Sequence, residues 1–222
     1  MRQGMLNPPA AGRQAKQFMK ISAEQLPHKI AFTGAGGVGK TKLIEAIEEQ
    51  CESPSIGIVA EAARVYFRNN PTIPVAQRYD FEHQEKIQRM AMGLEEMALD
   101  PDLDYLFTDR SVFDAPVCVA SAGDEKGAEI LLGRAWLWVP GNSEISYSQI
   151  YVLDPSDVPF KRDAERTEGE ATRQRQHEMF LEFFSSHGIN HKLLSGTLDE
   201  RTEKVLAELP QVLSESGFLK TE

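Results

Sequence analysis

A glycine-rich segment near the start of the chain has the spacing G-x-x-x-x-G-K-[ST]. Its residues are Gly34, Ala35, Gly36, Gly37, Val38, Gly39, Lys40 and Thr41. Glycines let a backbone curl so that its N–H groups point at phosphate oxygens, and the N-terminus of a following helix adds partial positive charge. Lys40 would give the β- and γ-phosphates a cation, and Thr41 would offer a hydroxyl to Mg²⁺. The segment therefore predicts a site for a nucleoside triphosphate and Mg²⁺.

This motif indicates phosphate binding only where a strand precedes it and a helix follows it. The apolar run 30–33 lies directly before Gly34, and Leu43, Ile44 and Ile47 recur at helical spacing after the lysine. A chance glycine-rich turn would not need this context, so we interpret the segment as a P-loop.

Strand-like and helix-like segments alternate along the rest of the chain. Apolar runs predict strands near 29–33, 56–60, 104–109, 149–153 and 190–194. Helical spacing predicts helices over about 40–50, 78–98, 112–122, 171–187 and 199–208. The alternation predicts an α/β fold in which helices cover both faces of a parallel sheet of about five strands. The pattern is less regular over 123–148, although residues 128–139 have helical character.

Composition indicates a single domain. With 41% hydrophobic and 26% charged residues, a chain of 222 residues can bury one sizeable core. We assign residues 29–222 to this domain and residues 1–28, rich in Gln, Pro, Gly and Ala, to an N-terminal extension. The formal charge of −10 disfavours a nucleic-acid partner without excluding a local basic patch.

The cysteines and the apolar runs exclude other classes of protein. Cys51 and Cys118 lie far apart, which predicts neither a disulfide framework nor a zinc site. No apolar run approaches the roughly 20 residues of a membrane span, and the first residues lack an apolar core of signal-peptide type. We therefore expect no membrane partner and a cytoplasmic location, while the oligomeric state stays open.

A carboxylate at the end of the third predicted strand is the second candidate for chemistry. Ligands of open parallel sheets lie beyond the carboxyl ends of the strands, so Asp109 is expected beside the phosphates. There it would bind Mg²⁺ through water or accept the proton of an attacking hydroxyl, and Arg110 would hold an anionic group of either substrate. The alternative is that Asp109 or Ser111 only caps the next helix.

An acid-base pair follows the second predicted strand. Glu61 and Arg64 are three residues apart, so they face the same way on a helical turn. We interpret them as substrate-binding groups and place Gln84, from the following helix, in the same pocket. A surface ion pair is an equally good account of Glu61 and Arg64.

A basic segment, about 155–170, lies where a lid is expected. Arg162 and Arg166 are spaced i, i+4, so both could point at a γ-phosphate during transfer; a solvated charged loop is the alternative. After the last predicted strand, Gly196 would permit close approach to an adenine, as in P-loop kinases, or it simply precedes a capped helix.

The chain resembles the ribosylnicotinamide-kinase-like branch of P-loop kinases, which includes the kinase domain of the bifunctional NAD-biosynthesis regulator. The resemblance covers about 29–208 and rests on the P-loop, Glu61-Ala-Ala-Arg64, Asp109-Arg110-Ser111 with Asp114, Val158-Pro159-Phe160 with Asp163 and Arg166, and the Ser-Gly-Thr-x-x-x-Arg turn. It implies a three-layer P-loop fold with strand order 2-3-1-4-5, ATP as donor and Asp109 close to the acceptor hydroxyl. The lid lacks the Asp-Gly that usually precedes its arginine, and the 123–148 segment has no counterpart. The resemblance therefore does not identify the acceptor of this chain.

Our leading hypothesis is a kinase that moves the γ-phosphoryl group of Mg·ATP to a hydroxyl of a nucleoside-like or other small acceptor. The candidate catalytic residues are Lys40, Asp109, Arg162 and Arg166. One alternative is a kinase acting on a modified base in DNA, of the phage hydroxymethyluracil type. Another is a regulatory P-loop ATPase without a small acceptor; a GTPase is disfavoured because the chain has no N-K-x-D motif.

Overall fold

Five strands and seven α-helices alternate in the residues that the computed structural model describes, which are 26–51, 55–141, 146–158 and 170–215. The strands are β1 (His28–Thr33), β2 (Ile56–Val59), β3 (Tyr105–Asp109), β4 (Tyr147–Leu153) and β5 (Lys192–Leu194). The helices are α1 (Lys40–Gln50), α2 (Ala62–Asn69), α3 (Phe81–Met97), α4 (Asp114–Ser121), α5 (Glu125–Gly141), α6 (Glu170–Ser186) and α7 (Leu198–Glu215). The predicted N-terminal extension lies almost entirely outside the described residues, as do Arg162 and Arg166 of the predicted lid.

The strands form one parallel sheet in the order β2-β3-β1-β4-β5. The predicted α/β fold and the strand order implied by the resemblance are both confirmed. In the register of β1 and β3, Phe32 pairs with Asp109. Because β1 ends one residue later at Thr33, the P-loop leaves the sheet beside the end of β3. The sheet thus places the phosphate-binding loop next to the predicted second acid.

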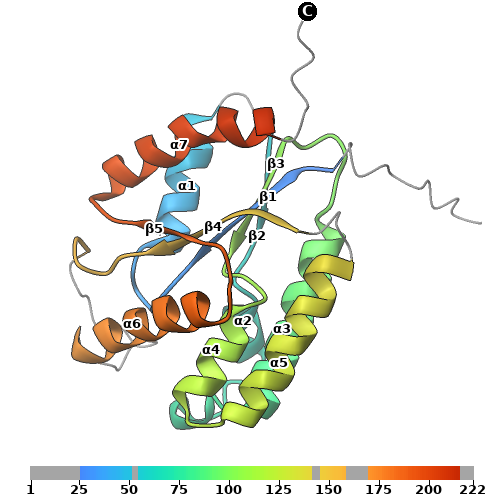
Figure 1. Cartoon of the computed structure of the whole chain (residues 1–222), viewed down its shortest axis with the longest axis vertical. Coiled ribbons are helices and arrows are strands. Elements are labelled where there is room, and N and C mark those ends of the chain that lie inside the picture. Colours follow the sequence, from blue (N-terminus) through green and yellow to red (C-terminus); the bar gives the residue numbers. More distant parts are fainter. Residues whose placement is uncertain (1–25, 52–54, 142–145, 159–169, 216–222) are drawn as a thin grey trace, which may run out of the picture.

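Alternate residues of the central strands build two separate cores. Ile30 and Phe32 of β1 face α1 and α7, where they pack among Leu43, Ile47 and Val205. Side chains on the other face of the sheet pack against α3, α4, α5 and α6; they include Ala31, Ile150 and Val152. Figure 1 shows α1 and α7 together on one side of the sheet and α3, α4, α5 and α6 across it. Because helices cover both faces of the sheet, residues 29–33 of β1 are all buried.

Two helices differ from the sequence prediction. The helix α2 was not among the predicted helices, although a helical turn was expected at Glu61 and Arg64; it is only eight residues long, and its buried residues are Ala62 and Tyr66. The irregular 123–148 segment contains α5, whose residues Leu131 and Leu132 are buried against the neighbouring helices. Among the described helices, none combines the length and apolar character required to cross a bilayer.

Candidate active site

Three glycines of the P-loop, Gly34, Gly37 and Gly39, have a positive φ that glycine adopts without strain. Gly39 ends the loop as the N-cap of α1 with φ of +89°. Gly34 begins it with φ of +122°, and a Cβ there would lie 3.1 Å from the carbonyl oxygen of Leu153. The loop is therefore held against the end of β4, and its curled backbone opens toward the N-terminus of α1, the arrangement that binds phosphate groups.

Lys40 lies under this loop. Its Nζ donates hydrogen bonds to the carbonyl oxygens of Gly34 at 3.2 Å and Ala35 at 2.9 Å, and the residue is only 6% exposed. Burial and the neighbouring Arg110 lower the pKa of Lys40 to about 8, against the opposing effect of Asp109, Glu61 and Asp114. A phosphate bound to the loop would be a stronger partner for this ammonium than two neutral carbonyls.

Thr41 and Asp109 offer oxygen ligands of the kind that Mg²⁺ prefers. The hydroxyl of Thr41 donates to Oδ2 of Asp109 at 2.5 Å, while Oδ1 of Asp109 is buried without a hydrogen-bond partner in the described structure. The described residues contain no cluster of three or more His, Cys, Asp or Glu that could enclose a metal. A hydroxyl and one carboxylate fit Mg²⁺ that takes its other ligands from a triphosphate and water.

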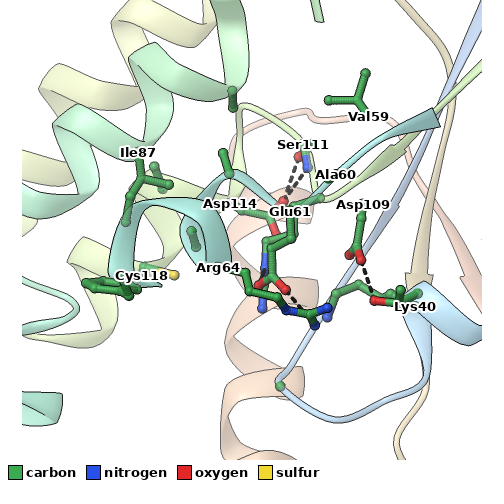
Figure 2. Close-up of a pocket in the computed structure, with 18 of the residues that line it drawn as sticks. Lys40, Val59, Ala60, Glu61, Arg64, Ile87, Asp109, Ser111, Asp114 and Cys118 are labelled. Carbon is green, nitrogen blue, oxygen red and sulfur yellow. Dashed lines mark hydrogen bonds and ion pairs between the residues drawn. The ribbon is translucent and has the colours of Figure 1, made fainter. Parts of the chain in front are cut away.

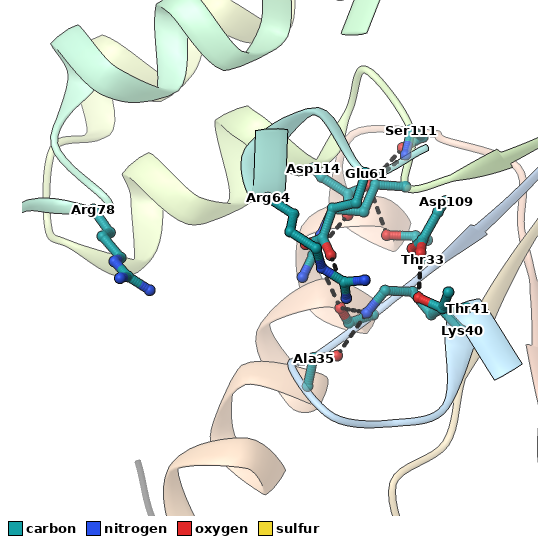
Figure 3. Close-up of polar contacts among 12 residues, drawn as sticks. Thr33, Ala35, Lys40, Thr41, Glu61, Arg64, Arg78, Asp109, Ser111 and Asp114 are labelled. Atoms are coloured by element: carbon teal, nitrogen blue, oxygen red, sulfur yellow. Dashed lines mark hydrogen bonds and ion pairs between the residues drawn. The ribbon is translucent and has the colours of Figure 1, made fainter. Parts of the chain in front are cut away.

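Arg110 joins the P-loop to two carboxylates. Its Nε donates to Glu61 at 2.7 Å, and its Nη1 lies 3.0 Å from Asp114 and 3.3 Å from the carbonyl oxygen of Gly34. Arg64 pairs with the other oxygen of Glu61 at 3.1 Å. In Figure 3, Glu61, Arg64 and Asp114 lie close to Lys40 and Asp109. Arg110 has a positive φ of 89°, unusual for a residue with a Cβ, which marks a constrained turn after β3.

The Glu61 carboxylate in this network is held in its charged form. Burial alone would raise the pKa of Glu61, but Arg110, Lys40 and Arg64 outweigh it and lower that pKa to about 2. Burial likewise opposes the charge on Arg110, and Glu61 with Asp114 holds its pKa well above the ordinary value. Arg110 is thus a fixed cation at the phosphate site.

Asp114 is a site residue that sequence reasoning did not include among its candidates. Its Oδ1 accepts hydrogen bonds from the hydroxyl of Thr33 at 2.6 Å and from the backbone N–H and hydroxyl of Ser111 at 2.9 and 2.7 Å. These contacts fix the start of α4 relative to the end of β1. The D-R-S-x-x-D spacing was the available signal.

A cavity of about 820 Å³ extends from the P-loop along α2 and α3. This volume lies within the usual range for small-molecule sites. Lys40 and Asp109 lie at one end and Ile87 and Cys118 at the other, with Glu61 and Arg64 between them (Figure 2). Burial raises the pKa of the Cys118 thiol to about 12, which disfavours its thiolate form.

Most predicted site residues meet at this cavity. Its lining includes Gly36, Gly37, Gly39, Lys40, Thr41, Glu61, Arg64, Gln84, Asp109 and Arg110. Glu61 and Arg64 are ion-paired, but together with Arg110 and inside the cavity rather than as an isolated surface pair. Gln84 donates its amide N–H to the carbonyl oxygen of Arg78 at 2.7 Å. Whether any of these side chains touches a substrate stays a prediction.

Gly196 lies away from the lining of the cavity and has a local structural explanation. Its φ is +114°, and a Cβ there would meet the side chain of Glu200 at 2.6 Å. Glu200 accepts a hydrogen bond from the backbone N–H of Thr197, whose hydroxyl accepts one from the N–H of Glu200. This is a capping box at the start of α7, so contact of Gly196 with adenine remains a prediction.

Comparison with known proteins agrees with this fold. Two crystal structures of NadR protein are similar in fold, one in complex with NAD and AMP-PNP at 14% sequence identity and one in complex with NR at 15%. Both have a TM-score of 0.65 over 90% of this chain and 52% of the NadR chain, so the chain spans about half the length of these neighbours. No curated protein sequence matches the chain.

At these identities, the NadR structures show that the chain shares their fold. A family profile described as an AAA domain matches residues 29–201, which include every element from β1 to the start of α7. The chain therefore belongs to this AAA-domain family of P-loop proteins.

Proposed function

We propose that the chain is a kinase that transfers the γ-phosphoryl group of ATP to a hydroxyl of a small, nucleoside-like acceptor. The observation that carries the proposal is a single cavity that begins at Lys40 and Asp109 and continues along α2 and α3. A nucleotide switch needs a site for the triphosphate alone, whereas a kinase needs room for a second substrate beside the γ-phosphate. The cavity supplies that room next to the acid at the end of β3.

Different side chains of the site have different roles in the transfer. The P-loop backbone and Lys40 hold the β- and γ-phosphates, and Arg110, fixed by Glu61 and Asp114, faces the same site. Mg²⁺ held by Thr41 and Asp109 would neutralise part of the phosphate charge when bound. Arg162 and Arg166 would close over the γ-phosphate as the lid.

The transfer itself requires in-line attack by the acceptor oxygen. A new bond forms between this oxygen and the γ-phosphorus while the bond from that phosphorus to the β–γ bridging oxygen breaks, and ADP leaves with the electron pair. The proton of the acceptor hydroxyl passes to the carboxylate of Asp109, which lines the cavity at the end of β3. Asp109 thus acts as the proton acceptor.

The fold neighbours support the two classes of substrate. One NadR structure contains AMP-PNP, which is an ATP analogue, and the other contains NR. A triphosphate donor and a nucleoside-like acceptor are therefore compatible with this arrangement of strands and helices. At 14% and 15% identity, these ligands suggest a class of acceptor rather than a particular molecule.

The proposal is tested by release of ADP from Mg·ATP in the presence of candidate acceptors. The panel contains nucleosides, NR, nucleoside monophosphates and base-modified DNA, and Lys40→Ala is the blank. Release that depends on a small acceptor supports the proposal. Release that depends only on modified DNA would indicate the DNA-base kinase, and slow release indifferent to every acceptor would indicate a regulatory ATPase.

A further inference from the structure

Three arginines lie along the wall of the cavity that α2 and the segment before α3 form. Arg64 and Arg68 come from α2, and Arg78 comes from the turn that precedes α3. From the contacts of these arginines we infer that the acceptor carries an anionic group, a phosphate monoester or a carboxylate, and that Arg78 binds it. This inference rests on the proposed kinase function and specifies the class of acceptor.

Arg78 has no anionic partner within the described part of the chain. Its guanidinium carbon lies 4.9 Å from the centre of the Phe67 ring, and its Nε is buried with no hydrogen-bond partner. No carboxylate of a described residue lies within ion-pair distance of it. An arginine stacked on an aromatic ring keeps its position while its in-plane N–H groups stay available. Arg78 is therefore held in place without using its donors.

The backbone of Arg78 is fixed by neighbours that do not touch its charge. Its carbonyl oxygen accepts the amide N–H of Gln84 at 2.7 Å, and its own N–H donates to the carbonyl oxygen of Val75 at 3.1 Å. Gln84, which we predicted as a substrate-binding residue, thus acts here as a positioning residue for Arg78. These contacts hold the guanidinium in one position, so little conformational entropy is lost when it binds a ligand.

The other arginines of this wall leave an excess of positive charge. Glu61, which directly precedes α2, is already ion-paired with both Arg64 and Arg110. Arg68 is exposed and, like Arg78, makes no ion pair with a described residue. A local positive wall in a chain with a formal charge of −10 favours an anionic ligand at this place.

The position of the arginines separates this group from the transferred phosphate. In Figure 3, Arg78 stands apart from Lys40 and Asp109, and Arg64 lies between. The γ-phosphate belongs beside Lys40, so the anion that Arg78 binds is a part of the acceptor remote from the attacking hydroxyl. Binding a remote anion orients the acceptor, which is a common source of specificity in transfer reactions.

The test compares uncharged acceptors with anionic counterparts. The panel pairs nucleosides, including NR, with their 5′-monophosphates and pairs simple sugars with the corresponding sugar acids, so phosphate and carboxylate are examined separately. For each compound, ADP release gives kcat and KM, and calorimetry gives the affinity without turnover. The variants are Arg78→Gln, which keeps polar atoms, and Arg89→Gln, which removes a 63% exposed arginine of α3 that pairs with Glu85.

We expect an anionic compound to bind and react better than its uncharged parent. Arg78→Gln should raise the KM for this compound by about tenfold or more, as expected when a charge-assisted hydrogen bond is lost, with a smaller change in kcat. Arg89→Gln should leave both constants unchanged. The inference is overturned if uncharged parents serve equally well, if the two variants behave alike, or if no anionic compound binds.

The same experiment distinguishes failure of the inference from failure of the proposed function. If ADP release depends on the acceptor but does not change with the Arg78 substitution, the inferred anion site is rejected and the kinase function is retained. If an anion binds in an Arg78-dependent way without accelerating ADP release, the kinase function is rejected and the anion site is retained.

Discussion

Replacing Glu61 by glutamine should destabilise the protein and do so in a pH-dependent way. The Glu61 carboxylate, which is 14% exposed, binds Arg110 at 2.7 Å and Arg64 at 3.1 Å. Burial acts to raise its pKa, but Arg110, Lys40 and Arg64 lower it from 4.5 to about 2. At about 1.4 kcal/mol per pH unit, this shift corresponds to an upper limit of about 3 kcal/mol of folding stability at neutral pH.

The sign of the pH dependence follows from the direction of the shift. Because the folded pKa of Glu61 is lower than the unfolded one, the stabilisation is fully present above about pH 4.5. It is lost as the pH falls from there toward about 2, since the unfolded chain takes up the proton first. The Glu61→Gln variant has no such proton to gain.

Urea unfolding of the wild type and Glu61→Gln at about pH 7 and about pH 3.5 measures this difference. At neutral pH, the free energy of unfolding of the variant should be lower than that of the wild type by up to about 3 kcal/mol. This difference should be smaller by about 1.4 kcal/mol at the lower pH. Glu82→Gln is the control, because Glu82 pairs with Lys86 on the surface with 72% of its side chain exposed. Equal effects of the two substitutions, or a gap that does not change with pH, would refute the reasoning.

Three further predictions concern the phosphate site. The pKa of Lys40 is lowered to about 8 by burial and by Arg110, so affinity for AMP-PNP should fall as the pH rises through about 8; calorimetry should show this fall in the wild type and its absence in Lys40→Met. Asp109→Asn should reduce kcat by about a hundredfold or more with little change in nucleotide affinity, and an equal loss of both would make Asp109 a structural acid. Gly34→Ala should lower the free energy of unfolding by about 1–3 kcal/mol, because φ is +122° and the Leu153 backbone leaves no room; an unchanged urea midpoint would contradict this.

The sheet and the phosphate site were predictable because their signals are local. The P-loop combines a fixed spacing with a strand before it and a helix after it, so eight consecutive residues and their flanks identify it. The position of Asp109 followed from one general rule, since carboxyl ends of parallel strands share one edge of the sheet. The register agrees with this rule, because Phe32 near the end of β1 pairs with Asp109 at the end of β3.

The pairing of charges inside the cavity could not be predicted from local patterns. Arg110 and Glu61 are 49 residues apart, and Thr33 and Asp114 are 81 apart, so no periodicity connects them. The i, i+3 spacing placed Glu61 and Arg64 together but gave no indication that Arg110 also occupies the carboxylate. No sequence pattern indicated a role for Arg78, because that role depends on its stacking on Phe67 and on the lack of an anionic partner among the described residues.

The central claim is most directly tested by following labelled phosphate from γ-labelled Mg·ATP in the presence of the acceptor panel. Separation of the products shows whether the label is attached to an acceptor or released as inorganic phosphate. We predict label on a small, nucleoside-like acceptor in the wild type and none in Lys40→Ala. Label that appears only as inorganic phosphate, with every acceptor unlabelled, would contradict the kinase account.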